Sequence, residues 1–366
     1  MLSRTKFYCT LGVLGALSGF AQWHLFCHGW PGLQHPFIGM LFVLAPCLFV
    51  VPHTLASHLP LMLEQLLGRI GGYYFFATYY LTVFLLPFAV LKALFLLPAL
   101  ASYELPALAF YARFVAIFTA AVMAAGFYRA HHPVIRRAVV RTDKPIPRDF
   151  TAAFASDIHL GPSIGPRFAR QLAVRLNGLH ADLVLFGGDM MDGDQKTVER
   201  QQGFQALAGI RAAWGVYGVL GNHDHYGYDV NSVKRQLEAA GIHILSGETV
   251  EPVPGIAITG IMDARYHAEK PAIPVLPEAF HILIEHEPVH IREAARCQGN
   301  LYLAGHTHAG QYWPNRIFVR KMFPFDYGTK LFEELTAIVT SGYGSWGARF
   351  RTGPAPEIVL VEVKKE

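Results

Sequence analysis

The sequence predicts two structural classes in one chain: an N-terminal all-α bundle of about four transmembrane helices, and a C-terminal α/β layered domain. Charged side chains make up 16% of the 366 residues, and only seven of them precede residue 129. From residue 150 onward, short apolar runs that end in polar residues or glycine alternate with amphipathic stretches, as in an α/β domain. We therefore divide the chain into a transmembrane domain (1–128), a basic, proline-containing linker (129–149) and an α/β domain (150–366).

Four apolar stretches before residue 129 are long enough to cross a bilayer, which takes about 20 apolar residues in a helix. They are Phe7–Phe26, Phe37–Leu55, Ile70–Leu86 and Leu108–Tyr128. The first is expected to be a retained helix and not a cleaved signal peptide, because further spans follow it. Phe88–Leu100 lies between two prolines and is expected to extend the third helix, re-enter the membrane or lie at its interface. Whether the domain has four or five transmembrane helices therefore stays open.

Lys and Arg in the short loops predict the orientation of the helices. Two cations precede the first helix, Arg69 lies in the second loop, and the linker after the fourth helix is basic. We therefore expect a multi-pass protein of the inner (plasma) membrane with a cytoplasmic C-terminal half. The linker cations can also hold an anionic leaflet, at about 1 kcal/mol each. No basic run with interleaved aromatic residues follows, so no nucleic acid is expected as a partner.

The C-terminal half contains nine candidate strands and four candidate helices. The strands are Thr151–Ser156, Asp182–Phe186, Val216–Leu220, Ile242–Leu245, Ile256–Ile261, His281–Ile284, Leu301–Ala304, Ala337–Thr340 and Ile358–Val363. The helices are Pro166–Leu179, Lys196–Ile210, Asn231–Ala240 and Pro288–Arg296. Four cysteines show no spacing typical of a zinc site or a disulfide framework.

Residues of the types that commonly bind metal ions, Asp, Asn and His, follow five of these strands. They are Asp157, His159, Asp189, Asp192, Asn222, His223, His286, His306 and His308. Side chains that gather at the carboxyl ends of strands suit an open α/β site. Asp and His together suit borderline divalent ions, and two such ions can clamp both the attacking and the leaving oxygen of a phosphoryl displacement.

The order of these motifs resembles that of the calcineurin-like metallophosphoesterase family, over about Phe150 to Lys364. The motifs are Asp157-x-His159, Gly188-Asp189-x-x-Asp192, Gly221-Asn222-His223-Asp224, His286 and Gly305-His306-x-His308. The resemblance implies a metallophosphoesterase sandwich with two central mixed sheets flanked by helices. It also implies two divalent metal ions, for which we expect Mn, with Fe or Zn as alternatives.

The resemblance further implies a role for each of these residues. Asp157, His159 and His308 would bind the first metal ion. Asn222, His286 and His306 would bind the second ion, and Asp189 would bridge the two. His223 would stabilise the transition state or protonate the leaving oxygen, with Asp192 orienting its ring.

Two departures from the family pattern narrow the substrate class. Gly193 and Asp224 stand where protein Ser/Thr phosphatases of the family have Arg and Glu, which argues against a protein phosphatase. The segments 305–311 and 342–358 resemble a bacterial membrane-associated branch, similar to the enzymes that split UDP-2,3-diacylglucosamine in lipid A synthesis. We therefore expect a hydrolase of a phosphodiester or pyrophosphate on a lipid-linked substrate held in the bilayer.

Two other function classes stay open. The chain could hydrolyse soluble nucleotide-type phosphoesters with its helices as a plain anchor, or it could be a non-catalytic membrane scaffold that only binds a ligand. Five C-terminal side chains are candidates for substrate contact or for simple packing, with equal weight for both. They are Trp313, Tyr343, Trp346, Arg349 and Arg351.

Overall fold

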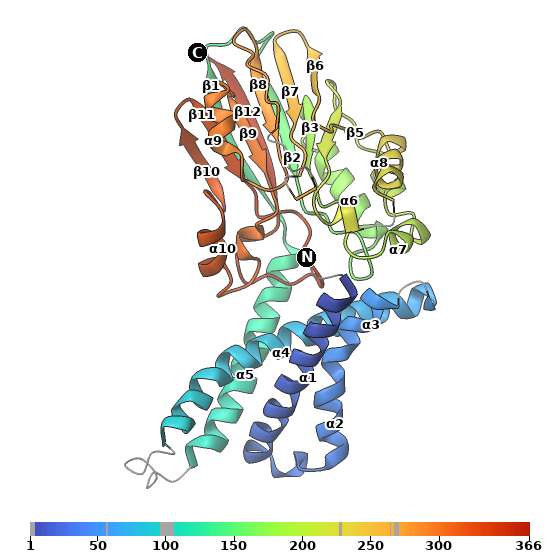
Figure 1. Ribbon diagram of the computed structural model, residues 1–366, viewed down its shortest axis with the longest axis vertical. Coiled ribbons are helices and arrows are strands. Elements are labelled where there is room, and N and C mark those ends of the chain that lie inside the picture. The colour runs from blue at the N-terminus through green and yellow to red at the C-terminus, as the bar shows by residue number, and fades with distance from the viewer. Residues whose placement is uncertain (1–3, 56–57, 96–105, 227–228, 264, 267–270) are drawn as a thin grey trace. The chain divides into compact units, whose positions relative to one another are not determined.

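The computed structural model describes residues 4–366 except 56–57, 96–105, 227–228, 264 and 267–270 (Figure 1). The chain divides into two compact units, Met1–Tyr128 and Arg129–Glu366. The first unit is helical. Its helices are α1 (Arg4–Gly29), α2 (Pro36–Leu44), α3 (Val50–Thr54), α4 (Leu61–Phe95) and α5 (Pro106–His131), with 3-10 turns at Pro31–Leu33 and Ala45–Phe49.

Helices form at all four predicted membrane positions, but a four-helix transmembrane bundle is not confirmed. Among the described residues, two segments are long and apolar enough to cross a membrane, Pro36–Thr54 and Ala109–His131. Polar side chains such as Gln22 and His24 lower the hydropathy of α1. The helix α4 continues through Pro87 to Phe95, so the first part of the stretch Phe88–Leu100 extends the third predicted helix. The remainder, residues 96–100, lies outside the described residues.

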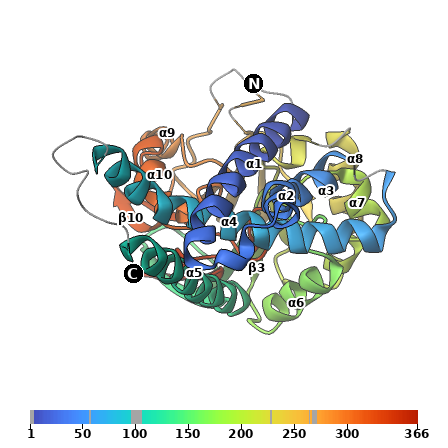
Figure 2. The ribbon, with the colours of Figure 1, turned by 90° about the horizontal axis from the view of Figure 1, so that it is seen from below.

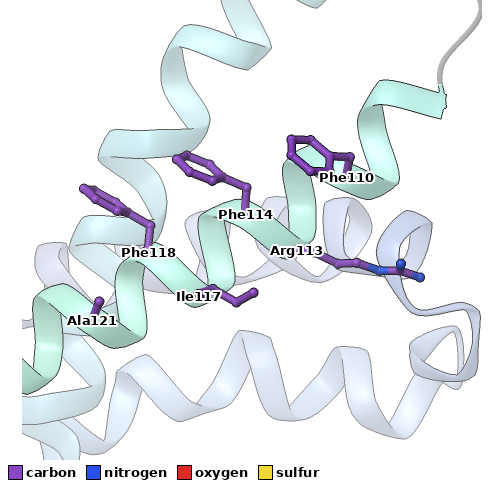
Figure 3. Close-up of a pocket in the computed structure, with 6 residues that line it drawn as sticks. All are labelled: Phe110, Arg113, Phe114, Ile117, Phe118 and Ala121. Carbon is purple, nitrogen blue, oxygen red and sulfur yellow. The ribbon is translucent and has the colours of Figure 1, made fainter.

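A hollow of about 410 Å³ lies along α5, as Figure 3 shows. Phe110, Phe114 and Phe118 follow one another at four-residue spacing, so their rings share one side of the helix. Arg113 also lines the hollow, and its guanidinium donates to the carbonyl of Gly29 at the end of α1, at 3.1 Å from Nη2. The exposed apolar side chains of this helix suit a surface that faces lipid tails.

The second unit contains twelve strands and five α-helices among its described residues. The strands are β1 (Val134–Thr142), β2 (Phe150–Ala155), β3 (Leu183–Gly187), β4 (Val216–Val219), β5 (His243–Ile244), β6 (Thr249–Val253), β7 (Ile256–Gly260), β8 (Phe280–Ile284), β9 (Leu301–Ala304), β10 (Gly328–Phe332), β11 (Leu335–Val339) and β12 (Glu357–Lys365). The helices are α6 (Pro166–Asn177), α7 (Gln195–Arg200), α8 (Val230–Ala239), α9 (Ile291–Arg296) and α10 (Arg316–Met322).

Two mixed six-stranded sheets form the centre of this unit, as the sequence predicted. The first has the order β1-β12-β2-β3-β4-β5 and the second the order β10-β11-β9-β8-β7-β6. In the first, β2, β3, β4 and β5 run parallel, and β12 is antiparallel to β2. In the second, β7, β8, β9 and β11 run parallel, with an antiparallel strand at each edge.

Alternating side chains divide the apolar core into three layers. In β3, Leu183 and Leu185 point between the two sheets, whereas Val184 and Phe186 point to the outer face of the first sheet. That outer face is covered by α6, α7 and α8, and α9 covers the outer face of the second sheet. Figure 2 shows α6, α7 and α8 on one side of the unit and α9 and α10 on the other. The result is a helix–sheet–sheet–helix sandwich.

The predicted linker is partly wrong, because its middle section is a strand. Residues 134–142 form β1, which pairs in parallel with all nine residues of β12. The buried Glu357 carboxylate accepts from Arg136 through both of its oxygens, at 3.0 and 3.1 Å. The basic side chains at positions 136, 137 and 141 hid this strand from sequence reasoning, because an edge strand that faces solvent tolerates charge.

Candidate metal centre

The candidate ligands follow five parallel strands, and most of them have an unusual backbone conformation. Asp157, His159, Asp189, His306 and His308 all have φ between 48° and 67°. This left-handed region is sparsely populated by side chains other than glycine, although Asp and His enter it more readily than most. Such strain concentrates at functional sites, where it directs side chains to a common point.

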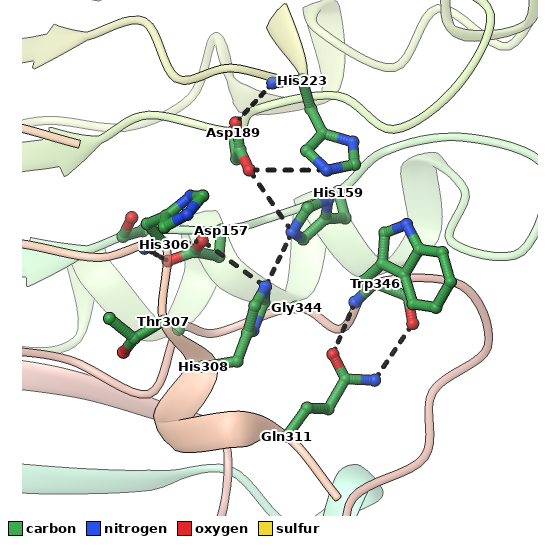
Figure 4. A network of polar contacts seen from close by, with 12 residues as sticks. Asp157, His159, Asp189, His223, His306, Thr307, His308, Gln311, Gly344 and Trp346 are labelled. Carbon is green, nitrogen blue, oxygen red and sulfur yellow. Dashed lines mark hydrogen bonds and ion pairs between the residues drawn. The ribbon is translucent and has the colours of Figure 1, made fainter. Parts of the chain in front are cut away.

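The first group of side chains comes from the β2 and β9 loops. Asp157, His159 and His308 place their ligand atoms within 4.8 Å of one another, and all three residues are buried. The Nε2 atoms of His159 and His308 are 2.9 Å apart, and Nε2 of His308 lies 3.5 Å from Oδ1 of Asp157 (Figure 4). The structure therefore brings together the three residues predicted for the first metal ion.

The second group comes from the β3, β4, β8 and β9 loops. Asp189, His286 and His306 also place their ligand atoms within 4.8 Å of one another. The Nε2 of His286 lies 3.1 Å from Oδ1 of Asn222 and 3.1 Å from Nδ1 of His306. The predicted second set, including Asn222, therefore also converges.

Asp189 lies between the two groups. Its Oδ2 is 3.2 Å from Nε2 of His286 in the second group and 3.8 Å from Nε2 of His159 in the first. Its other oxygen accepts from the backbone N–H of His223 at 2.8 Å. Gly221 permits this packing, since a Cβ on it would lie 2.2 Å from Oδ1 of Asp189. This carboxylate is placed as a bridging ligand would be.

His223 and Asp192 form a pair at the edge of the site. The Nδ1 of His223 lies 3.0 Å from Oδ1 of Asp192, and its Nε2 lies 4.0 Å from Oδ2 of Asp189. The second oxygen of Asp192 accepts from the backbone N–H of Gly347 at 3.3 Å. The Nδ1 nitrogen is thus directed at a carboxylate while Nε2 faces the centre, which fits a ring held for proton transfer.

The histidines of the site divide into two electrostatic kinds. Burial opposes a charge on His286, but the carboxylate of Asp189 raises its pKa to about 10. Burial lowers the pKa of His159 to about 4 and holds the pKa values of His306 and His308 well below the usual range. Burial opposes ionisation of Asp189 as well, but the charges of His286 and His223 hold its pKa well below the usual range. An ionised carboxylate surrounded by imidazole nitrogens is a donor set that suits borderline divalent ions. The donor set therefore fits two metal ions.

Asp224 supports the loops that carry the ligands. From its sequence position it could either orient the Asn222–His223 loop or cap a turn, and the structure favours orientation. Its buried carboxylate accepts N–H bonds from Met190 and Met191, at 2.9 and 3.0 Å, and from Gly221 at 2.9 Å. It therefore ties the loop after β3 to the loop after β4. The signal in the sequence was an Asp directly after a ligand motif.

Arg265 is a cation that sequence reasoning missed. Its guanidinium pairs through Nε with Glu287, and its Nη2 lies 3.3 Å from Nε2 of His306. About a third of the side chain is exposed, so it can reach both the site and solvent. No motif marks this position, because it lies in an irregular segment far along the chain from the ligands.

The C-terminal candidates for substrate contact divide into two kinds. Arg351 is fully buried, and its Nη2 donates to the carbonyl of Gly344 at 2.6 Å and to Nδ1 of His308 at 3.1 Å. Tyr343 is also buried and packs on Phe168. Both are packing residues beneath the site. Trp313 is exposed and Trp346 half-buried, and the backbone of Trp346 exchanges hydrogen bonds with the Gln311 amide (Figure 4).

Comparison with known families and proteins agrees with this geometry. The model of the calcineurin-like phosphoesterase family matches residues 150–310, which hold every candidate ligand. The family supports a metal-dependent phosphoester hydrolase with divalent metal ions, and the sheets and helices of the second unit fit a metallophosphoesterase sandwich.

Relatives of this phosphoesterase domain occur in bacteria and animals. An uncharacterized metallophosphoesterase of Helicobacter pylori is 27% identical over 65% of this chain and 66% of its own length. One from Aquifex aeolicus is 29% identical over 63% of this chain and 91% of its own length. A Danio rerio transmembrane protein with metallophosphoesterase domain is 31% identical over 57% of this chain and 52% of its own length. The match thus covers only part of the length of most of these relatives. The name of the Danio rerio protein, together with the two apolar segments of this chain, points to membrane association.

Proposed function

We propose that this protein hydrolyses a phosphodiester or pyrophosphate bond on a lipid-linked substrate, at a two-metal centre. The observation that carries the proposal is the place of the Asp189 carboxylate between two groups of candidate ligands, 3.2 Å from Nε2 of His286 and 3.8 Å from Nε2 of His159. When bound, two divalent ions supply the positive charge that stabilises both the attacking and the leaving oxygen. Mn is our first choice, with Fe or Zn as alternatives.

The residues of the chain divide the remaining tasks. One ion would be held by Asp157, His159 and His308, and the other by Asn222, His286 and His306. His223 would give a proton to the leaving oxygen from Nε2, while Asp192 at 3.0 Å keeps Nδ1 as the inner, hydrogen-bonded nitrogen. Asp192 acts only through the ring and is a positioning residue.

The membrane helices support a substrate that is itself anchored in the bilayer. A site tethered to a membrane meets lipid-linked phosphates at a high effective concentration. UDP-2,3-diacylglucosamine is the concrete substrate that we propose, on the resemblance of the segments 305–311 and 342–358 to enzymes of that class. The catalytic unit would then face the cytoplasm from the inner membrane.

The test is incubation of detergent-purified protein with UDP-2,3-diacylglucosamine and Mn²⁺, followed by detection of UMP. We expect UMP from the wild type and none above background from Asp189→Ala. If the wild type cleaves bis(p-nitrophenyl) phosphate but releases no UMP, the two-metal chemistry stands and this substrate is wrong. If neither substrate is cleaved with Mn²⁺, Fe²⁺ or Zn²⁺, the enzymatic proposal fails. The result would then favour the alternative of a non-catalytic membrane scaffold that binds a ligand.

A comparison of the acylated substrate with its deacylated counterpart distinguishes a lipid-linked substrate from a soluble nucleotide. A lipid-linked substrate predicts a kcat/KM at least about tenfold higher for the acylated compound, since its chains partition into the same micelle or bilayer as the enzyme. Equal values would favour a plain anchor. Removing the helices is a poorer test, because β1 starts at Val134 and a cut near residue 148 would delete an edge strand of the sheet.

A further inference from the structure

An apolar surface lies directly after the metal-ligand loop in sequence. Trp313, Ile317, Phe318 and Met322 have 56%, 56%, 63% and 68% of their surface exposed, and α10 has no buried residue. Apolar side chains of this size are normally exposed singly, not four within ten residues. We call these four residues, together with Lys321, the α10 surface.

The outward direction of the apolar side chains is fixed by an ion-pair network on the opposite side of the helix. Ile317, Phe318, Lys321 and Met322 fall on one side of α10 by the helical repeat. The buried Asp326 carboxylate holds the other side, since Arg316 approaches it at 2.8 Å and Arg320 at 3.7 Å. The helix thus packs its polar side against the domain and presents its apolar side outward, the reverse of a soluble amphipathic helix.

The α10 surface adjoins the end of a candidate membrane span. The span Ala109–His131 ends just past Arg129 and Ala130, which belong to the second unit. Arg129 donates to the carbonyl of Gly353 at 2.9 Å, and Arg349 donates to the carbonyl of Ala130 at 3.3 Å. The same loop holds the start of the surface, because Thr352 accepts from the backbone N–H of Trp313 at 2.8 Å.

This position decides which partner the surface fits. A helix that crosses a bilayer leaves it at the level of the headgroups, so groups bonded to its last turn lie near that level. Trp is enriched at this interface, and a cation beside apolar side chains is attracted by anionic lipid. A bilayer would bury the exposed apolar side chains of the α10 surface and at the same time offer anionic headgroups to Lys321.

The surface is also continuous with the metal centre. Trp313 follows His308 by five residues, which span at most about 18 Å of extended chain. Beyond the other end of α10, the Phe323 ring packs edge-on against the His306 ring, with centroids 5.3 Å apart. A bilayer that contacts α10 would therefore lie close to the ligands of both metal ions.

We infer that the α10 surface docks onto the lipid bilayer and thereby presents the metal centre to phosphate groups at the membrane surface. The partner is an anionic lipid surface, with the apolar side chains among the upper acyl chains and Lys321 at the headgroups. This inference deepens the proposed function and rests on it for the nature of the substrate. The docking itself can be measured without any substrate.

The first experiment measures docking in the full-length protein. The four native cysteines are replaced by Ser, and Phe318→Cys is labelled with an environment-sensitive fluorophore. The protein is reconstituted into vesicles of phosphatidylcholine and phosphatidylglycerol that contain lipids with a nitroxide on the acyl chain. The matched control is Val275→Cys, since the Val275 side chain is 54% exposed. Two residues further on, the carbonyl of Pro277 accepts from Lys144, which precedes β2. Val275 is thus expected near the end of the sheets opposite the ligands.

We expect the nitroxide lipids to quench the probe at position 318 severalfold more than the probe at position 275. Equal quenching at the two positions, or none at 318, overturns the inference. A probe at 318 that is shielded from water but not quenched by lipid, in a protein that crosslinks as a dimer, assigns the surface to a second copy and also overturns it.

The second experiment separates docking from catalysis. Ile317→Glu/Phe318→Glu should raise KM at least about tenfold for UDP-2,3-diacylglucosamine in vesicles. Hydrolysis of soluble bis(p-nitrophenyl) phosphate should change less than twofold, and Val275→Glu should change neither. Unchanged KM for the vesicle substrate refutes the docking role. If the lipid-linked substrate is not cleaved even by wild type, the substrate proposal fails, and the quenching result still decides the docking.

Discussion

The pairing of His223 with Asp192 makes a sharp prediction for the substitution Asp192→Asn. In the structure, one carboxylate oxygen lies 3.0 Å from Nδ1 of His223, and the other accepts from the N–H of Gly347 at 3.3 Å. An asparagine has only one acceptor oxygen, so it can serve His223 or Gly347 but not both. In either case the ring loses the negative charge beside it.

The size of the effect follows from that contact. A charge-assisted hydrogen bond contributes about 1.5–3 kcal/mol, and its neutral replacement roughly half as much. The difference of about 0.8–1.5 kcal/mol corresponds to roughly one pKa unit. Burial lowers the pKa of His223, but Asp189 and Asp192 outweigh burial and raise it above its usual range. Loss of the Asp192 charge should therefore lower this pKa by about one unit.

The expected sign in the pH profile is clear. A general acid must be protonated, so activity falls as pH rises through the pKa of His223. In Asp192→Asn this fall should occur at a pH about one unit lower, and kcat at the optimum should drop about 10- to 100-fold. His223→Ala should lose about 10²–10⁴-fold. The assay is kcat/KM for bis(p-nitrophenyl) phosphate from pH 5 to 10 at saturating Mn²⁺.

A matched control lies two residues along the chain. Asp194 is also buried, but its carboxylate caps α7 by accepting from the N–H of Lys196 at 2.9 Å. Asn caps a helix as well as Asp does, so Asp194→Asn should stay within about twofold of wild type. An unshifted pH profile and an unchanged rate in Asp192→Asn would refute the proton-transfer role of this pair.

Two other predictions concern a buried histidine and the cation at the site. Burial lowers the pKa of His281 to about 4. Its folded pKa lies below the unfolded value near 6.5, so the unfolded state binds more protons between these two pH values. The free energy of unfolding therefore decreases by up to about 3 kcal/mol as the pH drops through this window. His281→Gln should lose less melting temperature than wild type between pH 7 and 5, and an equal loss would show that other groups dominate. Arg265→Ala should raise KM for a phosphodiester about ten- to hundredfold with little change in kcat, because its guanidinium is a phosphate donor beside His306. Steady-state kinetics checks this, with Arg235→Ala on the exposed face of α8 as the control, and an unchanged KM for Arg265→Ala would remove the residue from substrate binding.

The sequence by itself determined which residues meet at the site, because each candidate ligand directly follows an apolar run that could only be a buried strand. Parallel strands end at a common edge, which predicts that Asp157 and Asp189 converge, and the family resemblance implied that His286 joins them. The alternation of strands and helices predicted an α/β layered domain, and the family resemblance implied the two mixed sheets. Local patterns sufficed where burial dictated the residue type.

Tertiary structure decided the features in which exposed or charged residues take part. The strand β1 carries three arginines and could be recognised only from its pairing with β12. The burial of Arg351 beneath His308 and the outward apolar side of α10 also depend on contacts between distant segments. Hydrophobic periodicity reports whether a side chain is buried, but it does not say which polar partner a buried charge finds or which exposed apolar side chains gather on one surface.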